Sequence, residues 1–413
     1  MTSAIDEQVI AEQVEVLMSG TEYGDPQTKD NMAQELRARL LQAQREGRPL
    51  RVYCGYDPRK PDLHLGHTIT MRKLRQFQDY GHDVTFLIGT FTSLIGDPSD
   101  VDKAREQLTP EQVDENARTY QQQAFKILDP ARTHVRRNDE WLSGLDFRDI
   151  IRLAQNFIVQ HFLTRENFAR RLDEGEAIYL HEMFYALMQA YDAVALKADV
   201  QVGGQDQLFN ILVAGRKLQQ ALGMPPLIAV IMGESLPGTD GVLKMSKSMG
   251  NHIPLLTTPE DMYGKVMSVP DDAMLLYHKL LLGWGEHELA ALQERMVSEP
   301  MQVKKDLAYK LVSIFMGDEA AEQGARHFAT VIQGEGLPED MPVYTISRST
   351  RITDILAETG LTASKSDAKR QITGGGVRLD GERVTNFETE IAPDQTPAVL
   401  QVGKRKFVRV VAG

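Results

Sequence analysis

The sequence predicts an α/β protein in which a large domain with a parallel sheet precedes a helical domain and a small α+β domain. From residue 50 to about residue 255, short β-rich segments alternate with helical patterns. This alternation is typical of a parallel sheet with helices on both faces. Helical patterns then continue alone to about residue 335, and short strands and helices return after a segment rich in Gly and Pro.

The large domain is expected to span residues 49–255, after a helical segment over residues 1–48 that ends at Gly47-Arg48-Pro49. Its β-rich segments are RVYCGYD (51–57), DVTFLIGTF (83–91), ADVQVGGQDQ (198–207) and PPLIAVIMG (225–233). Residues 110–190 contain mostly helical patterns, which predicts a helical insertion between the two halves of the sheet.

Two further domains are expected in the rest of the chain. Residues 256–335 predict a helical domain, residues 336–343 a linker, and residues 344–413 a small α+β domain. The whole chain has a net charge of -12, whereas residues 344–413 hold 11 Lys and Arg against 8 Asp and Glu, a net charge of +3. The acidic body argues against a general DNA-coating protein, and the basic C-terminal domain favours a local contact with nucleic acid.

Composition indicates a folded protein of a reducing compartment. The chain has 413 residues, of which 42% are hydrophobic and 25% charged. Cys54 is its one cysteine, so an intramolecular disulfide is excluded. The N-terminal residues lack the basic and then apolar pattern of a signal peptide, and no apolar run reaches membrane-spanning length. We therefore expect a cytoplasmic protein without a membrane partner.

A histidine pair marks the first candidate site. His64-Leu65-Gly66-His67 lies between a predicted strand and a predicted helix. The spacing of three is too short for a pair of metal ligands on a helix, whereas the free N–H groups of a helix start attract phosphate. Gly66 has no Cβ, so a nucleotide can approach the backbone. Alone, this motif is weak, because two surface histidines often occur by chance.

The second motif, GVLKMSKSMGN over residues 241–251, follows an apolar strand and predicts a flexible cationic loop. Taken alone, Lys244 and Lys247 are consistent with a solvated surface loop. Together with HLGH, about 180 residues upstream in an alternating α/β region, the motif resembles the signature pair of the class I aminoacyl-tRNA synthetases. These enzymes form an aminoacyl adenylate from ATP and then esterify tRNA.

The remaining segments indicate which amino acid is bound. In HEMFYALMQAYD (181–192), Tyr185, Gln189 and Asp192 share one face of a predicted helix whose other residues are largely apolar, so that face needs polar partners. Three glycine-bearing segments, VYCGYD (52–57), FTSLIGDPSD (91–100) and VGGQDQLFN (202–210), end predicted parallel strands, where ligands of open α/β sheets bind.

Over nearly its whole length, the chain resembles the bacterial tyrosyl-tRNA synthetases, in the subgroup with KMSKS rather than KFGKS. The resemblance implies a Rossmann-like catalytic domain, a helical domain on the anticodon side, and an S4-like RNA-binding domain. It further implies tyrosine and ATP as substrates, Mg²⁺ with the ATP, no tightly bound protein-ligated metal, tRNA(Tyr) as partner, and a homodimer joined through the helical insertion.

The resemblance also implies a role for individual residues. The catalytic residues are His64, His67, Thr70, Lys244 and Lys247. The tyrosine-binding residues are Tyr53 and Asp192 for the phenol hydroxyl, Asp97, Tyr185 and Gln189 for the ammonium group, and Gln207 near the carboxylate. The residues that line ATP or the adenylate are Cys54, Gly55, Asp57, Gly66, Gly204, Asp206 and Lys247. The RNA-binding residues are Lys365, Lys369 and Arg370. Lys103 and Arg105 are the candidates for binding pyrophosphate.

Three alternatives stay open from the sequence. Tryptophanyl-tRNA synthetases share both signatures, but Tyr53 with Asp192 favours a phenol over an indole. A catalytically silent RNA-binding paralogue is disfavoured by intact HLGH, KMSKS and Asp192. A small-molecule nucleotidylyltransferase shares the histidine crossover but has no need of the basic C-terminal domain.

Overall fold

The computed structural model describes residues 7–99, 107–333, 341–403 and 406–413. The chain divides into two compact units, one with residues 1–257 and 268–304, the other with residues 258–267 and 305–413. The domain boundaries expected from the sequence differ from this division and stay a prediction.

Five parallel strands form the central sheet of the first unit. They are β1 (Arg51–Tyr56), β2 (Asp83–Ile88), β3 (Thr133–Arg137), β4 (Val200–Gly204) and β5 (Ile228–Met232). Their order in the sheet is β3-β2-β1-β4-β5, and all pairings are parallel. The order reverses between β1 and β4, so the α/β class with a Rossmann-like sheet is confirmed.

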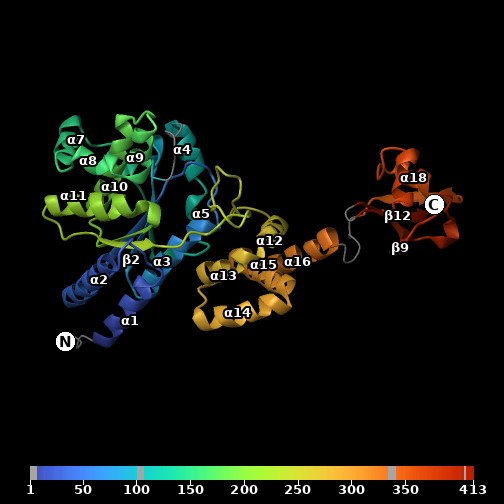
Figure 1. Cartoon of the computed structure of the whole chain (residues 1–413), viewed down its shortest axis with the longest axis horizontal. Helices are drawn as coiled ribbons and strands as arrows, with labels where there is room; N and C mark the ends of the chain where they lie inside the picture. Colours follow the sequence, from blue (N-terminus) through green and yellow to red (C-terminus); the bar gives the residue numbers. More distant parts are fainter. Residues whose placement is uncertain (1–6, 100–106, 334–340, 404–405) are drawn as a thin grey trace. The chain divides into compact units, whose positions relative to one another are not determined.

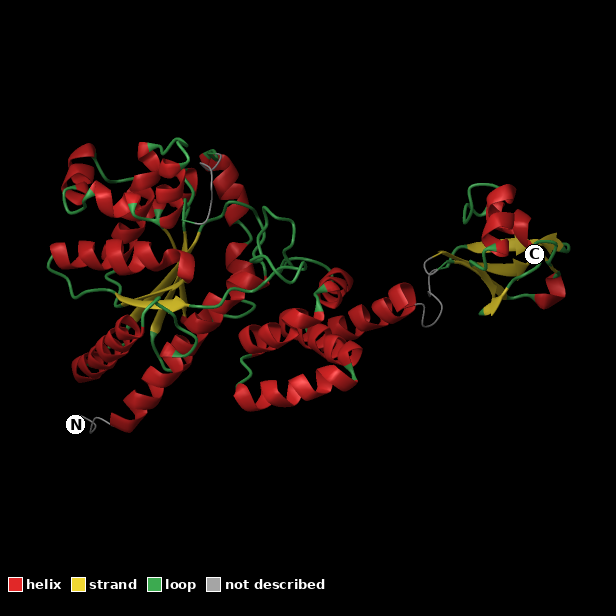
Figure 2. Cartoon of the chain, in the orientation of Figure 1, coloured by secondary structure: helices red, strands yellow, loops and turns green. Residues whose placement is uncertain are grey.

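Helices cover both faces of this sheet, with α10 and α11 on one side and α1 to α3 on the other (Figures 1 and 2). The helices up to β5 are α1 (Glu7–Met18), α2 (Pro26–Glu46), α3 (Thr68–Asp79), α4 (Pro110–Ala117), α5 (Tyr120–Ala124), α6 (Asp139–Leu142), α7 (Phe147–Ala154), α8 (Val159–Leu163), α9 (Glu166–Asp173), α10 (Leu180–Ala195) and α11 (Arg216–Ala221). Gly47 ends α2 with a left-handed backbone, φ 64°, as the predicted break at Gly47-Arg48-Pro49 requires.

The segment 110–190 is mostly helical, but it also contains β3, which the sequence analysis did not predict. The sequence of β3, THVRR, has a single apolar residue, Val135, and alternates between exposed and half-buried positions. This is the pattern of an edge strand, since only one neighbour, β2, covers it. With one apolar residue, this segment shows neither the apolar run nor the apolar alternation by which a strand is predicted from sequence.

Helices follow β5 in the chain: α12 (Pro259–Ser268), α13 (Met274–Tyr277), α14 (Glu286–Ser298), α15 (Pro300–Met316) and α16 (Asp318–His327). The C-terminal part adds α17 (Ile352–Glu358) and α18 (Lys365–Thr373) with β6 (Val343–Ile346), β7 (Thr350–Arg351), β8 (Val377–Leu379), β9 (Glu382–Arg383), β10 (Glu390–Ile391), β11 (Ala398–Val402) and β12 (Lys406–Ala412).

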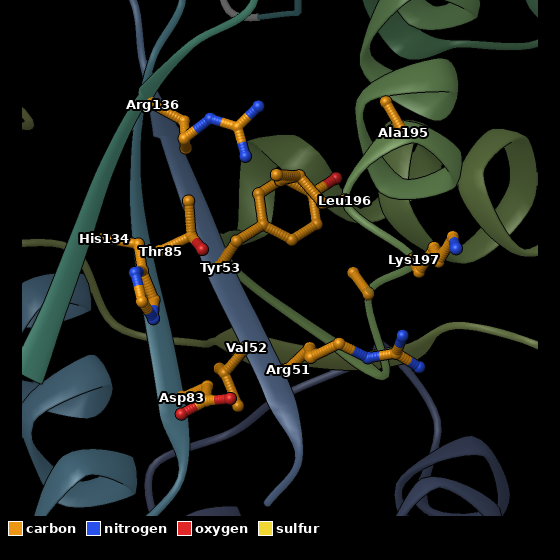
Figure 3. A pocket seen from close by; sticks show the side chains of 11 residues that line it. Arg51, Val52, Tyr53, Asp83, Thr85, His134, Arg136, Ala195, Leu196 and Lys197 are labelled. Carbon is orange, nitrogen blue, oxygen red and sulfur yellow. The ribbon is translucent and has the colours of Figure 1, made fainter.

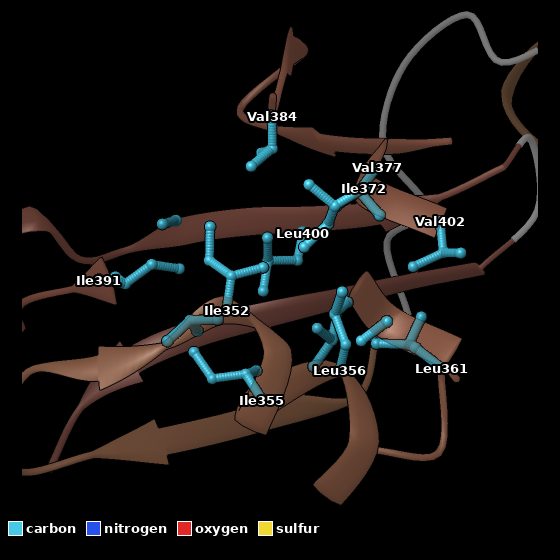
Figure 4. Packing of buried hydrophobic residues seen from close by; sticks show 14 of the residues in the cluster. Ile352, Ile355, Leu356, Leu361, Ile372, Val377, Val384, Ile391, Leu400 and Val402 are labelled. Carbon is cyan, nitrogen blue, oxygen red and sulfur yellow. The ribbon is translucent and has the colours of Figure 1, made fainter. Parts of the chain in front are cut away.

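The α+β character of the C-terminal part is confirmed. Five of its strands form a mixed sheet in the order β6-β12-β11-β8-β9. Apolar side chains of α17, α18 and the sheet, among them Ile352, Ile355, Ile372 and Leu400, are fully or almost fully buried in one cluster (Figure 4). This cluster gives the part a hydrophobic core of its own.

Candidate functional site

The predicted site residues gather at the carboxyl ends of β1 and β4, where the strand order reverses. Asp57 follows β1, and Asp206 and Gln207 follow β4. Ligands of open α/β sheets bind at this position because the diverging connections leave a crevice there. The glycines of β4 keep it open: a Cβ on Gly204 would lie 2.7 Å from Asp206 Oδ1.

The two histidines of HLGH pack against each other at the start of α3, with their rings tilted by 50°. Their ring centroids are 3.8 Å apart, and the backbone N–H of His64 donates to Nδ1 of His67 (3.2 Å). Burial lowers the pKa of His67 to about 3 and that of His64 well below its ordinary value. Both are therefore neutral at pH 7. Gly66 makes room for them, because a Cβ there would lie 3.0 Å from the His64 ring.

Positive charge comes instead from the loop with KMSKS. Lys244 Nζ lies 3.2 Å from Asp206 Oδ1. Lys247 Nζ donates to the hydroxyl of Tyr120 (3.3 Å) and to the Lys60 carbonyl (3.4 Å). Burial lowers the pKa of Lys247 to about 8. Lys244 thus lies against the end of β4, and Lys247 against the segment before HLGH, on the side where the sequence predicts the nucleotide.

One side chain holds this loop in shape. Asn251 accepts from the Ser246 backbone N–H (2.8 Å) and donates to Asp240 (2.5 Å). A Cβ on Gly238 would lie 2.2 Å from the Asn251 side chain. The side chain of Asn251 therefore stabilises the turn that contains Lys244 and Lys247.

Tyr53 and Asp192 form the deepest part of the predicted tyrosine site. Tyr53 is 1% exposed, and within the described residues its hydroxyl has no hydrogen-bond partner. Asp192 accepts from Trp141 Nε1 (2.8 Å) and Asn138 Nδ2 (3.2 Å). Burial nevertheless raises the pKa of Asp192 to about 8. A phenol hydroxyl could accept a hydrogen bond from the Tyr53 hydroxyl and donate one to the Asp192 carboxylate, whose ionisation burial disfavours.

Asp57, predicted to line the adenylate, contacts Tyr185, predicted to bind tyrosine. Its two oxygens accept from Thr92 Oγ1 (2.7 Å) and from the hydroxyl of Tyr185 (3.1 Å). Burial raises the pKa of Asp57 to about 6. The residue after β2 must be a glycine for Asp57 to make these contacts, because a Cβ added at Gly89 would lie 2.0 Å from Asp57 Oδ1.

The other residues predicted to bind the ammonium and carboxylate groups meet around Asn210. Asn210 Nδ2 lies within hydrogen-bond distance of Gln189 (3.1 Å) and Gln207 (3.1 Å), and Gln207 in turn donates to Asp97 (2.5 Å). Burial raises the pKa of Asp97. The structure thus brings Asp97, Gln189 and Gln207 into one network, while Tyr185 reaches Asp57 instead.

The remaining residues of the predicted site lie on β1 and α3. Thr70 donates to the His67 carbonyl (3.0 Å), so its oxygen accepts from the hydroxyl of Tyr56 (2.8 Å). Cys54 is buried, and burial raises the pKa of its thiol to about 11. Gly55 is exposed in the middle of the buried strand.

The predicted RNA-binding residues lie along α18. Lys365 pairs with Asp354 (3.0 Å), Arg370 pairs with Asp367 (2.6 Å), and Lys369 Nζ lies 5.0 Å from the centre of the Phe387 ring. The side chain of Arg370 is 80% exposed. The predicted pyrophosphate residues Lys103 and Arg105 lie outside the described residues.

A cavity of about 350 Å³ opens at the opposite ends of the strands. Figure 3 shows Arg51 and Asp83, the first residues of β1 and β2, on its wall, and Tyr53 beside Leu196. Tyr53 is a predicted site residue that also lines this cavity. The cavity lacks HLGH, KMSKS and the acids described above, so the crevice is the candidate active site.

Sequence reasoning missed several residues that hold this site. Those residues are Asn138, Trp141, Asn210, Thr92, Gly89 and Tyr120. Asn138 and Trp141 follow the edge strand β3, which was itself not predicted. Because β3 has a single apolar residue, no local pattern marked Asn138 or Trp141 as site residues.

Among the described residues, no group of three or more His, Cys, Asp or Glu could hold a metal ion. In that same part of the chain, the search for a helix both long and apolar enough to cross a membrane found none.

Two family models and several known proteins are similar to this chain over most of its length. Residues 45–333 match the family model described as tRNA synthetases class I (W and Y), and residues 333–410 match the model of the tyrosine–tRNA ligase SYY-like C-terminal domain. The chain is similar to the tyrosine–tRNA ligase of Thermotoga maritima, with 48% identity over 91% of this chain and 93% of the relative. It is also similar to that of Moorella thermoacetica, with 44% identity over 98% and 97%.

Solved structures support the fold. A C-terminally truncated mitochondrial tyrosyl-tRNA synthetase of Aspergillus nidulans superposes with a TM-score of 0.60 and 23% identity, over 78% of this chain and 93% of the other.

Proposed function

The chain belongs to the class I tRNA synthetases for tryptophan and tyrosine, and we propose which of its residues perform each step of the reaction. Its activity is that of a tyrosine–tRNA ligase, which joins tyrosine and ATP to tyrosyl-adenylate and pyrophosphate and then transfers tyrosine to the 3′ end of tRNA. The observation that best supports our assignment is the buried pair of Tyr53 and Asp192. The Tyr53 hydroxyl has no hydrogen-bond partner among the described residues, and burial raises the pKa of Asp192.

In the first step, the carboxylate of tyrosine attacks the α-phosphorus of ATP, and the bond to pyrophosphate breaks. This carboxylate is already ionised at pH 7, so no general base is required. Catalysis then depends on position and on charge stabilisation. We assign phosphate hydrogen bonds to neutral His64 and His67, and the stabilisation of departing pyrophosphate to Lys244 and Lys247. Mg²⁺ would supply further positive charge on the phosphates, bound mainly by them.

Recognition of tyrosine is assigned to both ends of the substrate. Its phenol hydroxyl would accept from Tyr53 and donate to Asp192, which supplies partners for two buried groups. Phenylalanine would leave the Tyr53 hydroxyl without a partner and Asp192 with Trp141 and Asn138 alone, at a cost of about 1–3 kcal/mol for each hydrogen bond not formed. At the other end, Asp97 and Gln189 would receive the ammonium group.

Separate measurements of tyrosine binding and of adenylate formation test these roles. His67→Ala and Lys247→Ala should slow single-turnover adenylate formation on the order of a hundredfold. The dissociation constant of tyrosine should stay within a factor of about three. A large loss of tyrosine affinity with an unchanged chemical step would contradict the assignment.

We also propose that α18 contacts the tRNA(Tyr) backbone. Lys365, Lys369 and Arg370 lie on this helix, and the side chains of Lys365 and Arg370 are 60% and 80% exposed. Replacing all three by Ala should raise the KM for tRNA and leave ATP–pyrophosphate exchange unchanged. The change in KM should shrink as salt rises, because phosphate contacts release counterions. An unchanged KM for tRNA at low salt would refute this proposal.

The predicted homodimer is supported by exposed apolar side chains in the helical insertion. Phe147 is 77% exposed, Leu180 69%, Leu172 58% and Val159 55%. Such residues in one insertion are typical of a protein interface. We propose a cytoplasmic dimer through this surface. Sedimentation should give a dimer for the natural chain and a monomer for Phe147→Asp with Leu180→Asp, and a monomeric natural chain would contradict the proposal.

A further inference from the structure

Arg165, between α8 and α9, is a buried arginine that no motif predicted. It is 7% exposed, and its guanidinium lies 5.0 Å from the ring centre of Phe209 and 5.3 Å from that of Phe168. Its Nη2 donates to Ser99 Oγ (2.5 Å). Within the described part of the chain, its buried Nη1 has no hydrogen-bond partner. A purely structural arginine would be expected to use both terminal nitrogens.

Ser99 connects Arg165 to Asp97. The Ser99 hydroxyl and backbone N–H both donate to Asp97 Oδ1, at 2.6 Å and 2.9 Å. Because the Ser99 hydroxyl has one hydrogen, and Asp97 receives it, its oxygen is left to accept from Arg165. The hydrogen bonds therefore run in one direction, from the guanidinium through Ser99 to the carboxylate.

We propose that Arg165 is a positioning residue for tyrosine activation: through Ser99 it fixes the Asp97 carboxylate that receives the substrate ammonium group. This inference rests on the proposed role of Asp97 in tyrosine binding. The Gln207 amide holds the second oxygen, Oδ2 (2.5 Å), so both oxygens of Asp97 have a defined direction. Arg165 acts on the substrate through Asp97 and need not touch it.

Charge gives Arg165 a second effect on Asp97. Two other carboxylates, Asp57 and Asp206, face Asp97, and the Tyr185 hydroxyl lies on the same side. Burial and this acidic surrounding raise the pKa of Asp97, whereas Ser99, Gln207 and Arg165 lower it. The charge of Arg165 therefore favours the ionised carboxylate, which is the form that binds an ammonium group.

The α9 segment provides matched controls. Asn167 holds the same loop without charge, since its Nδ2 donates to the Pro98 carbonyl (2.6 Å). Arg170 is an exposed arginine on the same helix. Comparing Arg165→Met with Asn167→Ala separates the effect of the Arg165 charge from the effect of anchoring the loop. Comparing Arg165→Met with Arg170→Met separates a local effect from a change in net charge.

The test is ATP–pyrophosphate exchange as a function of tyrosine concentration and pH. For Arg165→Met we expect the KM for tyrosine to rise on the order of tenfold, with a smaller change in kcat. The acid limb of kcat/KM for tyrosine, which Asp57 and Asp97 share, should move to higher pH. Arg165→Lys should restore the position of the limb. Neither Asn167→Ala nor Arg170→Met should move it.

Asp97→Asn distinguishes this inference from the proposed function. If Asp97→Asn raises the KM for tyrosine while Arg165→Met leaves both KM and the acid limb unchanged, the role of Arg165 is wrong and that of Asp97 stands. If Asp97→Asn leaves the KM unchanged in a chain that activates tyrosine, the ammonium assignment fails first. A limb that moves equally in Asn167→Ala would reduce Arg165 to a loop anchor and overturn the inference.

Discussion

Asp192→Asn should make the ligand-free protein more tolerant of alkaline pH while it weakens tyrosine binding. Burial raises the pKa of Asp192 to about 8 in the folded chain, against about 4 in an unfolded one. A carboxyl with a raised folded pKa contributes stability that is complete below pH 4 and is lost as pH rises through 8. Asparagine does not ionise, so the variant does not lose this contribution to its unfolding free energy as pH rises from 4 to 8.

The size of the effect follows from the same two pKa values. One pKa unit corresponds to about 1.4 kcal/mol, so Asp192 lowers the unfolding free energy of the parent by about 4 kcal/mol more at pH 9 than at pH 5. A constant penalty acts in the opposite direction. Asn138 already accepts from the Phe91 N–H through its oxygen (2.8 Å), so its amide cannot turn to suit an asparagine. One lost hydrogen bond costs about 1–3 kcal/mol at every pH.

Trp141 provides the assay, because its indole N–H bonds to Asp192 (2.8 Å). The chain has two tryptophans, so a Trp284→Phe background leaves Trp141 as the single reporter. Urea unfolding followed by its emission should show the difference in unfolding free energy, variant minus parent, increasing with pH by about 4 kcal/mol between pH 5 and pH 9. In the folded parent, the emission should itself titrate near pH 8, and saturating tyrosine should lower that midpoint.

The control is Asp139→Asn, which removes a partly exposed carboxylate at the start of α6, the helix that carries Trp141, and should not reproduce the increase of about 4 kcal/mol. A difference for Asp192→Asn that does not change with pH would refute the reasoning, because Asp192 would then be ionised in the fold as easily as in water.

Three other outcomes follow from the site. Tyr53→Phe removes a buried hydroxyl that has no partner among the described residues, so the ligand-free protein should be as stable as the parent or about 1 kcal/mol more stable by urea unfolding, while the KM for tyrosine rises. A clear loss of stability would show that the hydroxyl has a partner. Gly89→Ala places a Cβ 2.0 Å from Asp57 Oδ1 and should depress ATP–pyrophosphate exchange on the order of a hundredfold, with an unaffected rate arguing against the Asp57 contact. Burial lowers the pKa of Lys247 to about 8, so kcat/KM for ATP should fall as pH rises through 8. Lys247→Arg should move this fall to higher pH, because arginine keeps its proton. A fall at the same pH in the variant would assign it to another group.

The sequence predicted those parts of the fold and site that local pattern encodes. The apolar runs around β1, β2, β4 and β5 predicted a parallel sheet, and HLGH with KMSKS predicted the nucleotide side of the crevice. These signals are local because a buried parallel strand and a phosphate-binding crossover each need consecutive residues of a defined kind. The polar stripe of α10 likewise indicated buried polar contacts, because polar side chains on an otherwise apolar helix need partners.

What the sequence left out depends on tertiary contacts. Polar β3 becomes a strand only because β2 lies beside it, and with it Asn138 and Trp141 come to hold Asp192. Arg165 and Ser99 are 66 residues apart, and no periodicity connects them. Their contact follows from the packing of α9 against the loop after β2, which pattern reasoning from one sequence does not reach.

ATP–pyrophosphate exchange with purified protein, given tyrosine, tryptophan, phenylalanine or no amino acid, tests the central claim most directly. We expect exchange with tyrosine and background exchange with the others, since only a phenol satisfies both Tyr53 and Asp192. Exchange with tryptophan would keep the chemistry of HLGH and KMSKS but contradict the assigned pocket. No exchange with any amino acid, from protein shown to be folded, would contradict the account as a whole.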